Sequence, residues 1–270
     1  MGDILGVHGI GQGRATTQQL SQAWTAALAK GWPGGAGAPG VVVPHLSPLL
    51  RPSTGRLGID ADDEMADDEV ELVLAAAMEY LGDPDDDELA RLEVEGRTLG
   101  LLPVPAPLLA VVRALDAKLG QGRREQILGL VREVAAYLNH AEVRDQVRDA
   151  LLAADPGPGL VVGHSLGSVI AYDLAVHGAP FGALVTMGSP LGLRTIREHR
   201  TLTVDAGSPP GSWTNVHDPN DPVTAGVGLH TSWPQVVDVR VDNGRPWQDS
   251  HGAKHYLSHH ETGAAVAALL

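Results

Sequence analysis

The chain contains no cysteine and a single phenylalanine among its 270 residues. Without cysteine, neither a disulfide framework nor a thiolate metal site is possible. Aromatic residues make up 4% of the sequence and hydrophobic residues 43%, so the core must consist mainly of aliphatic side chains and alanine. Basic residues are also scarce, with 19 Lys and Arg against 33 Asp and Glu. The formal net charge of -14 argues against charge-driven binding to nucleic acid or to an anionic membrane surface.

Membrane-targeting features are lacking as well. The first residues, MGDILGVHGIG, contain neither the basic region nor the long apolar region of a signal peptide. Gly6 stands where an N-myristoylation pattern requires Ser or Thr. The longest apolar stretch, at 99–112, is too short to span a bilayer and is interrupted by prolines. We therefore expect a soluble, cytoplasmic protein without a stable membrane anchor.

Apolar runs near the N-terminus predict a βαβ unit. The segments 3–8 and 41–46 are short and apolar, which is typical of buried strands. Between them, the spacing of Leu20 and Trp24 predicts a helix over 16–31. A strand, a helix and a second strand in this order favour a parallel sheet.

The same alternation returns in the last third of the chain. Strands are predicted at 160–163, 183–187 and 236–242, and helices at 166–177 and 261–270. The sequence therefore predicts an α/β fold with a mostly parallel sheet flanked by helices.

The middle of the chain follows a different pattern. Residues 60–69 are densely acidic but lack the glycine that an EF-hand loop requires, so we interpret them as a solvated face or loop. Helical spacings follow with no strand pattern between them, at 69–81, 85–95, 106–119 and 123–152. We expect one domain over 1–270 that contains a mostly helical insertion at 50–150. Its apolar segment at 99–112 predicts part of a lid or entrance wall, with an ordinary buried connection as the alternative.

One pentapeptide carries the chemistry. Gly163-His164-Ser165-Leu166-Gly167 is a G-x-S-x-G sequence that lies between a predicted buried strand and a predicted helix. In that setting the serine occupies a tight turn whose flanking glycines avoid collisions with neighbouring backbone. The turn would expose the Ser165 hydroxyl at the helix N-terminus, where the backbone N–H of Leu166 can stabilise a developing oxyanion.

Together with VHGIG at 7–11 and GSPLG at 188–192, this pentapeptide resembles the lipase-like serine esterases of the α/β-hydrolase superfamily. The resemblance covers the first 50 residues and the chain from about 155 onward, but not the helical middle. It implies an α/β-hydrolase fold and a second oxyanion-binding N–H from Ile10 or Gly11. The rival interpretation of HGIGQG as a dinucleotide-binding loop would need glycine at position 14, which is Arg14.

A serine nucleophile needs a base, and the base needs an acid. The resemblance implies the chain order serine, acid, histidine. Two carboxylates, Asp218 and Asp221, lie in the segment 213–223, and we favour Asp221 because it begins a DPV sequence, as the acid does in similar esterases. For the base the resemblance favours His251, a few residues before a Tyr-Leu pair that packs on the core, with His255 as the second choice.

A metal site is the alternative interpretation of the C-terminal histidines. His251, His255 and His259 are spaced by four residues and would share one face of a continuous helix. No adjacent Asp or Cys completes a ligand set, and Gly252 weakens a helix there. We therefore expect no metal.

These features predict a serine hydrolase that cleaves a small-molecule or lipid carboxylic ester through an acyl-enzyme, with no cofactor. Ser165 would be the nucleophile, His251 the base and Asp221 the acid, while the N–H groups of Leu166 and Ile10 would bind the oxyanion. A thioesterase, an amidase or an acyltransferase could use the same residues. A non-catalytic interaction module on a hydrolase fold is the alternative of a different class. The sequence indicates no particular protein partner.

Overall fold

A computed structural model describes residues 4–9, 12–13, 15–50, 67–82, 121–154, 159–244 and 250–270. Within these ranges six strands form one sheet in the order β2-β1-β3-β4-β5-β6, and every neighbouring pair is parallel. The strands are β1 (Ile4–Val7), β2 (Val41–Val42), β3 (Leu160–His164), β4 (Ala183–Met187), β5 (Ser212–His217) and β6 (Val237–Arg240). The predicted α/β class and parallel sheet are confirmed.

The direction in which the chain adds strands to the sheet reverses once, at β1. The chain passes from β1 outward to β2, returns to the other side of β1 as β3, and then adds β4, β5 and β6 in sequence. The loops that follow β1 and β3 therefore leave the sheet on opposite sides at its carboxyl edge. In open parallel sheets, ligands bind in the crevice that opens at such a point.

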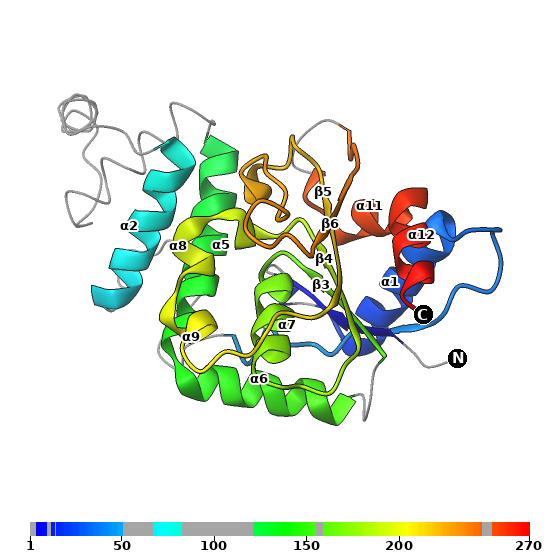
Figure 1. Cartoon of the computed structure of the whole chain (residues 1–270), viewed down its shortest axis with the longest axis horizontal. Helices are drawn as coiled ribbons and strands as arrows, with labels where there is room; N and C mark the ends of the chain where they lie inside the picture. The colour runs from blue at the N-terminus through cyan, green and yellow to red at the C-terminus, as the bar shows by residue number, and fades with distance from the viewer. Residues whose placement is uncertain are drawn as a thin grey trace.

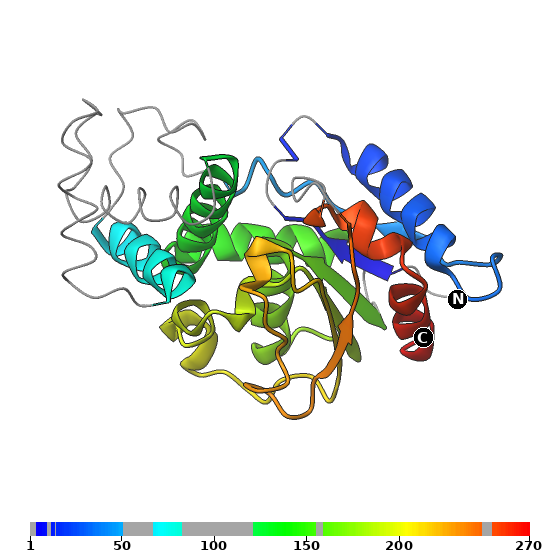
Figure 2. The ribbon, with the colours of Figure 1, turned by 90° about the horizontal axis from the view of Figure 1, so that it is seen from above.

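Helices cover both faces of the sheet (Figures 1 and 2). Successive residues of β3 pack into different cores, because side chains alternate along a strand: Leu160 and Val162 pack on one side and Val161 on the other. The first core also contains residues of α1 (Thr17–Gly31), α11 (Ala253–Ser258) and α12 (His260–Ala268). The second contains residues of α2 (Asp67–Leu81), α5 (Gln121–Asn139), α6 (Ala141–Ala154) and α7 (Leu166–Val176).

The predicted helix at 16–31 is confirmed, and its start has a clear local cause. The side chain of Thr16 accepts a hydrogen bond from the Gln19 backbone N–H, while the Gln19 side chain accepts one from the Thr16 N–H. This capping box satisfies two of the N–H groups that a helix start leaves unpaired. The apolar residues Leu20 and Trp24 are buried against the sheet as their spacing predicted.

The single helix predicted over 123–152 is wrong, because two helices occupy this range and meet at His140. The guanidinium of Arg144 donates to the carbonyl oxygens of Tyr137 and Leu138, and the Thr201 hydroxyl also donates to that of Leu138. Side chains thus take the place of the next helical turn at the end of α5. The buried residues of α5 and α6 belong to the same core.

The insertion is helical where it is described. α2 begins within two residues of its predicted start, whereas the helices predicted at 85–95 and 106–119 and the apolar segment at 99–112 lie outside the described residues. Across the described ranges, no helix combines the length and the apolar character needed to cross a bilayer. The remaining short elements are η2 (Pro190–Gly192), α8 (Arg194–Arg197), α9 (Arg200–Thr203) and η3 (Pro222–Thr224).

Contacts from the end of α2 reach the sheet's carboxyl edge. The Glu79 carboxylate accepts hydrogen bonds from the backbone N–H groups of Arg194 and Thr195 and thereby caps α8. The hydroxyl of the next residue, Tyr80, donates to the carbonyl oxygen of Val223 in η3 at 2.9 Å. The described part of the insertion is therefore fixed against the loop that follows β5.

Candidate active site

Ser165 lies in the turn between β3 and α7 with φ 56° and ψ −130°. A positive φ is uncommon for a residue other than glycine, and such strain persists only where the surroundings enforce it. The neighbouring glycines permit this turn, because a Cβ atom at Gly163 would lie 2.6 Å from the carbonyl oxygen of Gly167. A Cβ atom at Gly167 would collide with the backbone of Val7 in β1. The tight turn expected around Ser165, with glycines that avoid collisions with neighbouring backbone, is therefore present.

The structure brings Ser165, His251 and Asp221 into one chain of contacts. Nε2 of His251 lies 2.9 Å from the Ser165 hydroxyl oxygen, and Nδ1 of His251 lies 2.8 Å from Oδ2 of Asp221. Asp221 follows β5, His251 precedes α11, and all three side chains are buried. These residues come from three different loops at the carboxyl edge of the sheet.

The two second choices lie elsewhere. The Asp218 carboxylate accepts hydrogen bonds from the backbone N–H groups of Asn220 and Asn243, so it organises the turn. His255 lies within α11. Of the four candidates for acid and base, Asp221 and His251 are therefore the two that form a hydrogen-bonded chain with Ser165.

Asp221 is held in its ionised form. Burial raises the pKa of its carboxyl, but the attraction of His251 and hydrogen bonds from His251, Tyr256 and Val223 outweigh burial, so the pKa lies below its usual value. The Val223 backbone N–H donates to Oδ1, and the Tyr256 hydroxyl donates to Oδ2 at 2.7 Å. An ionised Asp221 requires the proton on Nδ1 of His251, which leaves Nε2 free to accept the serine proton.

The backbone on both sides of His251 is also held. Nε2–H of His164 donates to the carbonyl oxygen of His251 at 2.6 Å, and the Asn243 side-chain amide donates to that of Ser250 at 2.5 Å. The rings of His164 and His251 lie 4.7 Å apart. Burial, followed by the proximity of His251, lowers the pKa of His164 to about 3, so its ring is neutral at ordinary pH.

The loop after β1 passes directly beside the serine. A Cβ atom at Gly9 would lie 2.5 Å from the Cβ atom of Ser165, so only glycine allows this approach. His8 fixes the loop: its Nδ1–H donates to the Gly9 carbonyl oxygen, and its Nε2 accepts from the Leu46 N–H at 2.8 Å. Leu166 is the first residue of α7, a position whose N–H has no partner within its helix. Ile10 and Gly11, the predicted sources of the second oxyanion N–H, lie outside the described residues.

The helical face needed for a three-histidine metal site does not form. Gly252 caps α11, so His251 precedes the helix and its ring turns toward Ser165. His259 follows the helix, and its Nε2 contacts the Asn243 side chain at 2.9 Å. Over the parts of the chain that the structure describes, no three His, Asp or Glu side chains are grouped so as to hold a metal ion.

Three contributors to the site were not predicted from the sequence. No role of its own was predicted for His164, Tyr256 was expected only to pack on the core, and Asn243 was not singled out. The signal for Tyr256 was its position shortly after the base, but no sequence pattern pairs its hydroxyl with a carboxylate 35 residues away. The sequence signal for His164 was its position next to Ser165 in the same pentapeptide.

Comparisons with protein-family models, with curated proteins and with solved structures gave no match for this chain. The chemistry of the site must therefore be argued from its geometry. A buried serine hydroxyl, an imidazole and an ionised carboxylate, joined in that order, are the parts that nucleophilic acyl transfer requires.

Proposed function

We propose that this chain is a serine hydrolase with the α/β-hydrolase fold and that it cleaves carboxylic esters. The observation that carries the proposal is the hydrogen-bonded chain from Ser165 through His251 to Asp221. The strained turn at Ser165, between a parallel strand and a helix, supports the same assignment because it matches the nucleophile elbow of that fold. The order serine, acid, histidine along the sequence is also that of the fold.

In the first half of the reaction, Ser165 Oγ attacks the ester carbonyl carbon while Nε2 of His251 takes its proton. The negative charge that develops on the carbonyl oxygen is stabilised by the N–H of Leu166 at the start of α7 and by that of Ile10. The C–O bond then breaks, His251 returns the proton to the departing alcohol, and an acyl-serine remains. Asp221 stabilises the imidazolium throughout, because it accepts the hydrogen bond from Nδ1.

In the second half, water takes the place of the alcohol. His251 removes a proton from the water as its oxygen attacks the acyl carbon, and the same N–H groups bind the second oxyanion. Collapse of this intermediate releases the carboxylic acid, and Ser165 Oγ recovers its proton from His251. All atoms are accounted for by ester and water, so the cycle needs no cofactor.

We further propose that the helical insertion at 50–150 covers the entrance to this site. The described part that supports this is α2, whose Tyr80 hydroxyl is bonded to Val223 two residues after the acid. A cover fixed to the loop of Asp221 would shield the bound ester from bulk water while Ser165 attacks it.

The proposal is tested by covalent labelling with a fluorophosphonate probe, which reacts only with an activated serine. The wild type should be labelled and the Ser165→Ala variant should not. Ser232→Ala, which changes an exposed serine, is the matched control and should be labelled like the wild type. An unlabelled wild type would favour a non-catalytic module, and labelling of Ser165→Ala would place the nucleophile elsewhere.

A substrate panel then separates the reactions that share this mechanism. p-Nitrophenyl acetate and butanoate test for ester cleavage, and matched thioesters and anilides test for the other leaving groups. We expect the highest kcat/KM on the esters. A preference of the labelled enzyme for thioesters or amides would keep the residue roles but change the class of substrate.

A further inference from the structure

The strained backbone of Ser165 is held by hydrogen bonds on both sides of the residue. Its N–H donates to the carbonyl oxygen of Met187, the last residue of β4, at 3.0 Å. Its carbonyl oxygen accepts two hydrogen bonds from Ser168, one from the backbone N–H at 2.9 Å and one from the side-chain hydroxyl at 2.5 Å. Because strained conformations persist only where their surroundings enforce them, these contacts help to keep the turn in place.

The carbonyl group of Ser165 and the N–H of Leu166 belong to one peptide unit. A peptide unit is planar and almost always trans, so its C=O and N–H point in opposite directions. Whatever fixes the Ser165 carbonyl oxygen therefore also fixes the direction of the Leu166 N–H. Under the proposed function this N–H meets the developing oxyanion, and such donors are effective because they are oriented before the reaction. The Ser168 hydroxyl is thus placed to orient the donor.

The Ser168 hydroxyl is itself held by a serine of another segment. Its oxygen lies 2.7 Å from the hydroxyl oxygen of Ser189, which accepts a hydrogen bond from the Leu191 N–H in η2. A hydroxyl carries one hydrogen and a carbonyl oxygen can only accept, so Ser168 donates to Ser165 and Ser189 donates to Ser168. The two serines are 0% and 2% exposed, so these hydrogen bonds are shielded from bulk water.

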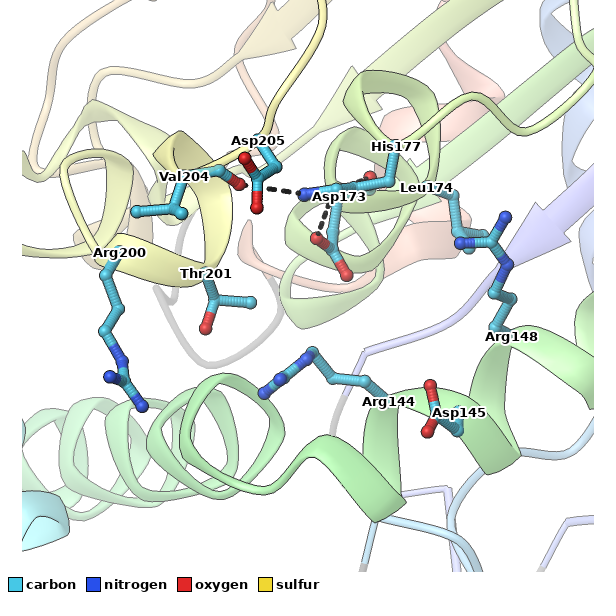
Figure 3. A pocket seen from close by; sticks show the side chains of 10 residues that line it. All are labelled: Arg144, Asp145, Arg148, Asp173, Leu174, His177, Arg200, Thr201, Val204 and Asp205. Atoms are coloured by element: carbon cyan, nitrogen blue, oxygen red, sulfur yellow. Dashed lines mark hydrogen bonds and ion pairs between the residues drawn. The ribbon is translucent and has the colours of Figure 1, made fainter.

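The far end of α7 is fixed by other contacts. The Tyr137 hydroxyl of α5 donates to Oδ2 of Asp173 at 2.6 Å, and Nδ1 of His177 lies 3.0 Å from Oδ1 of the same carboxylate (Figure 3). Of the 11 residues of α7, 10 are buried. Loss of the Ser168 hydroxyl should therefore loosen the first turn of α7 and leave the helix in place.

We propose that Ser168 is a positioning residue for the oxyanion donor and that Ser189 acts on the reaction through Ser168. This inference rests on the proposed serine hydrolase function. It concerns the moment when Ser165 Oγ bonds to the ester carbon and the carbonyl electron pair moves to the oxygen. The Leu166 N–H stabilises that charge only if it already points toward the oxygen.

The test compares Ser168→Ala, Ser189→Ala and the double variant with the wild type on a p-nitrophenyl ester. We expect kcat to fall by about tenfold in Ser168→Ala and by less in Ser189→Ala, with KM unchanged, because the orientation matters when the oxyanion forms. The double variant should match Ser168→Ala, since Ser189 acts through it. The inhibition constant of an alkyl trifluoromethyl ketone, which forms an oxyanion when it bonds to the serine, should rise in parallel.

Tyr137→Phe is the matched control, because it removes a buried hydrogen bond from the far end of the same helix. Its kcat and inhibition constant should equal those of the wild type. Equal losses in Tyr137→Phe and Ser168→Ala would reduce the effect to a general loosening of α7 and overturn the inference. A rise in KM at unchanged kcat would also overturn it, and so would a double variant in which the two single losses multiply.

Thermal melting shows whether each variant is folded at the assay temperature. If Ser168→Ala is not, Ser189→Ala alone must show the lower kcat at unchanged KM, and wild-type values for it would overturn the inference. An active wild type with unchanged kcat in Ser168→Ala would overturn this inference and leave the proposed function standing. A wild type that the fluorophosphonate probe does not label would overturn both.

Discussion

The hydroxyl of Tyr256 donates to Oδ2 of Asp221 at 2.7 Å, the same carboxylate oxygen that accepts the hydrogen bond from His251. The backbone N–H of Asp218 donates in turn to the Tyr256 hydroxyl oxygen at 3.2 Å. Burial and the adjacent Asp221 carboxylate raise the pKa of Tyr256, so its proton stays in place as the donor. Tyr256 thus ties α11 to the Asp221 carboxylate.

Tyr256→Phe removes this hydrogen bond and keeps the ring. We expect kcat to fall by roughly tenfold, because Asp221 loses one of the donors that orient it toward His251. Steady-state kinetics with a p-nitrophenyl ester measures the effect. Tyr172→Phe, which alters a tyrosine packed between Trp213 and Trp233, is the control and should leave kcat unchanged. Equal kcat values for Tyr256→Phe and wild type would show that the hydroxyl has no positioning role.

Ser165→Ala should abolish ester hydrolysis and leave the fold intact, because it removes one oxygen from a turn whose glycines remain. The members of a catalytic triad act as a unit, so the loss of kcat should be on the order of 10³-fold or more. Circular dichroism and thermal melting check the fold. A variant that kept a tenth of the wild-type rate would contradict the nucleophile assignment.

His251→Ala should lose activity nearly as completely as Ser165→Ala, whereas His255→Ala should keep most of it. The reason is geometric, since His251 Nε2 lies 2.9 Å from the serine oxygen and His255 lies within α11. Both variants are assayed with the same ester, and the reverse pattern would transfer the role of base to His255. Addition of a chelator to the wild type should have no effect, and inactivation by it would reopen the question of a metal.

His164 should make the folded state sensitive to acid. Its pKa falls from 6.5 to about 3 on folding, so between these values the unfolded chain binds a proton that the folded chain does not. Stability therefore declines as the pH falls through this window. His164→Gln, which keeps a side-chain N–H donor, should show a shallower decline of melting temperature from pH 6.5 toward 3 than the wild type.

The same residue can be tested in the reaction. His164→Gln should retain activity within about tenfold, because its amide can still donate to the His251 carbonyl oxygen, while His164→Leu should lose considerably more. His260→Gln, at an exposed position, serves as the control for both measurements. Identical activities of the Gln and Leu variants would exclude a role for this hydrogen bond.

The strands of the sheet could be predicted because each is marked by a short apolar run in the sequence. The apolar runs at 160–163 and 183–187 are buried on both faces and correspond within one residue to β3 and β4. The boundary between α5 and α6 was missed, although the buried residues Leu138 and Val143 are five apart and so break the helical spacing. The side chains that end α5 there include Thr201, which is distant in sequence and could not be foreseen.

The site was predictable to a different degree for each residue. Ser165 could be read from its own pentapeptide, because the turn, strand and helix are contiguous. Asp221 and His251 required the resemblance, since nothing within their own segments distinguishes them from Asp218 and His255. Contacts such as that of His164 with the His251 carbonyl join positions 87 residues apart and depend on the finished fold.

The hydrogen bond between Asn243 and Ser250, just before His251, affects how well the chain should tolerate insertions and deletions. Asn243 and Ser250 are joined directly by a hydrogen bond, so the two ends of the chain segment between them lie close together. The entropic cost of joining two such ends grows only slowly with the number of residues between them. Added or deleted residues between these two positions should therefore leave His251 in register with Ser165. A short epitope or a fluorescent label inserted here should leave the contacts of His251 with Ser165 and Asp221 in place.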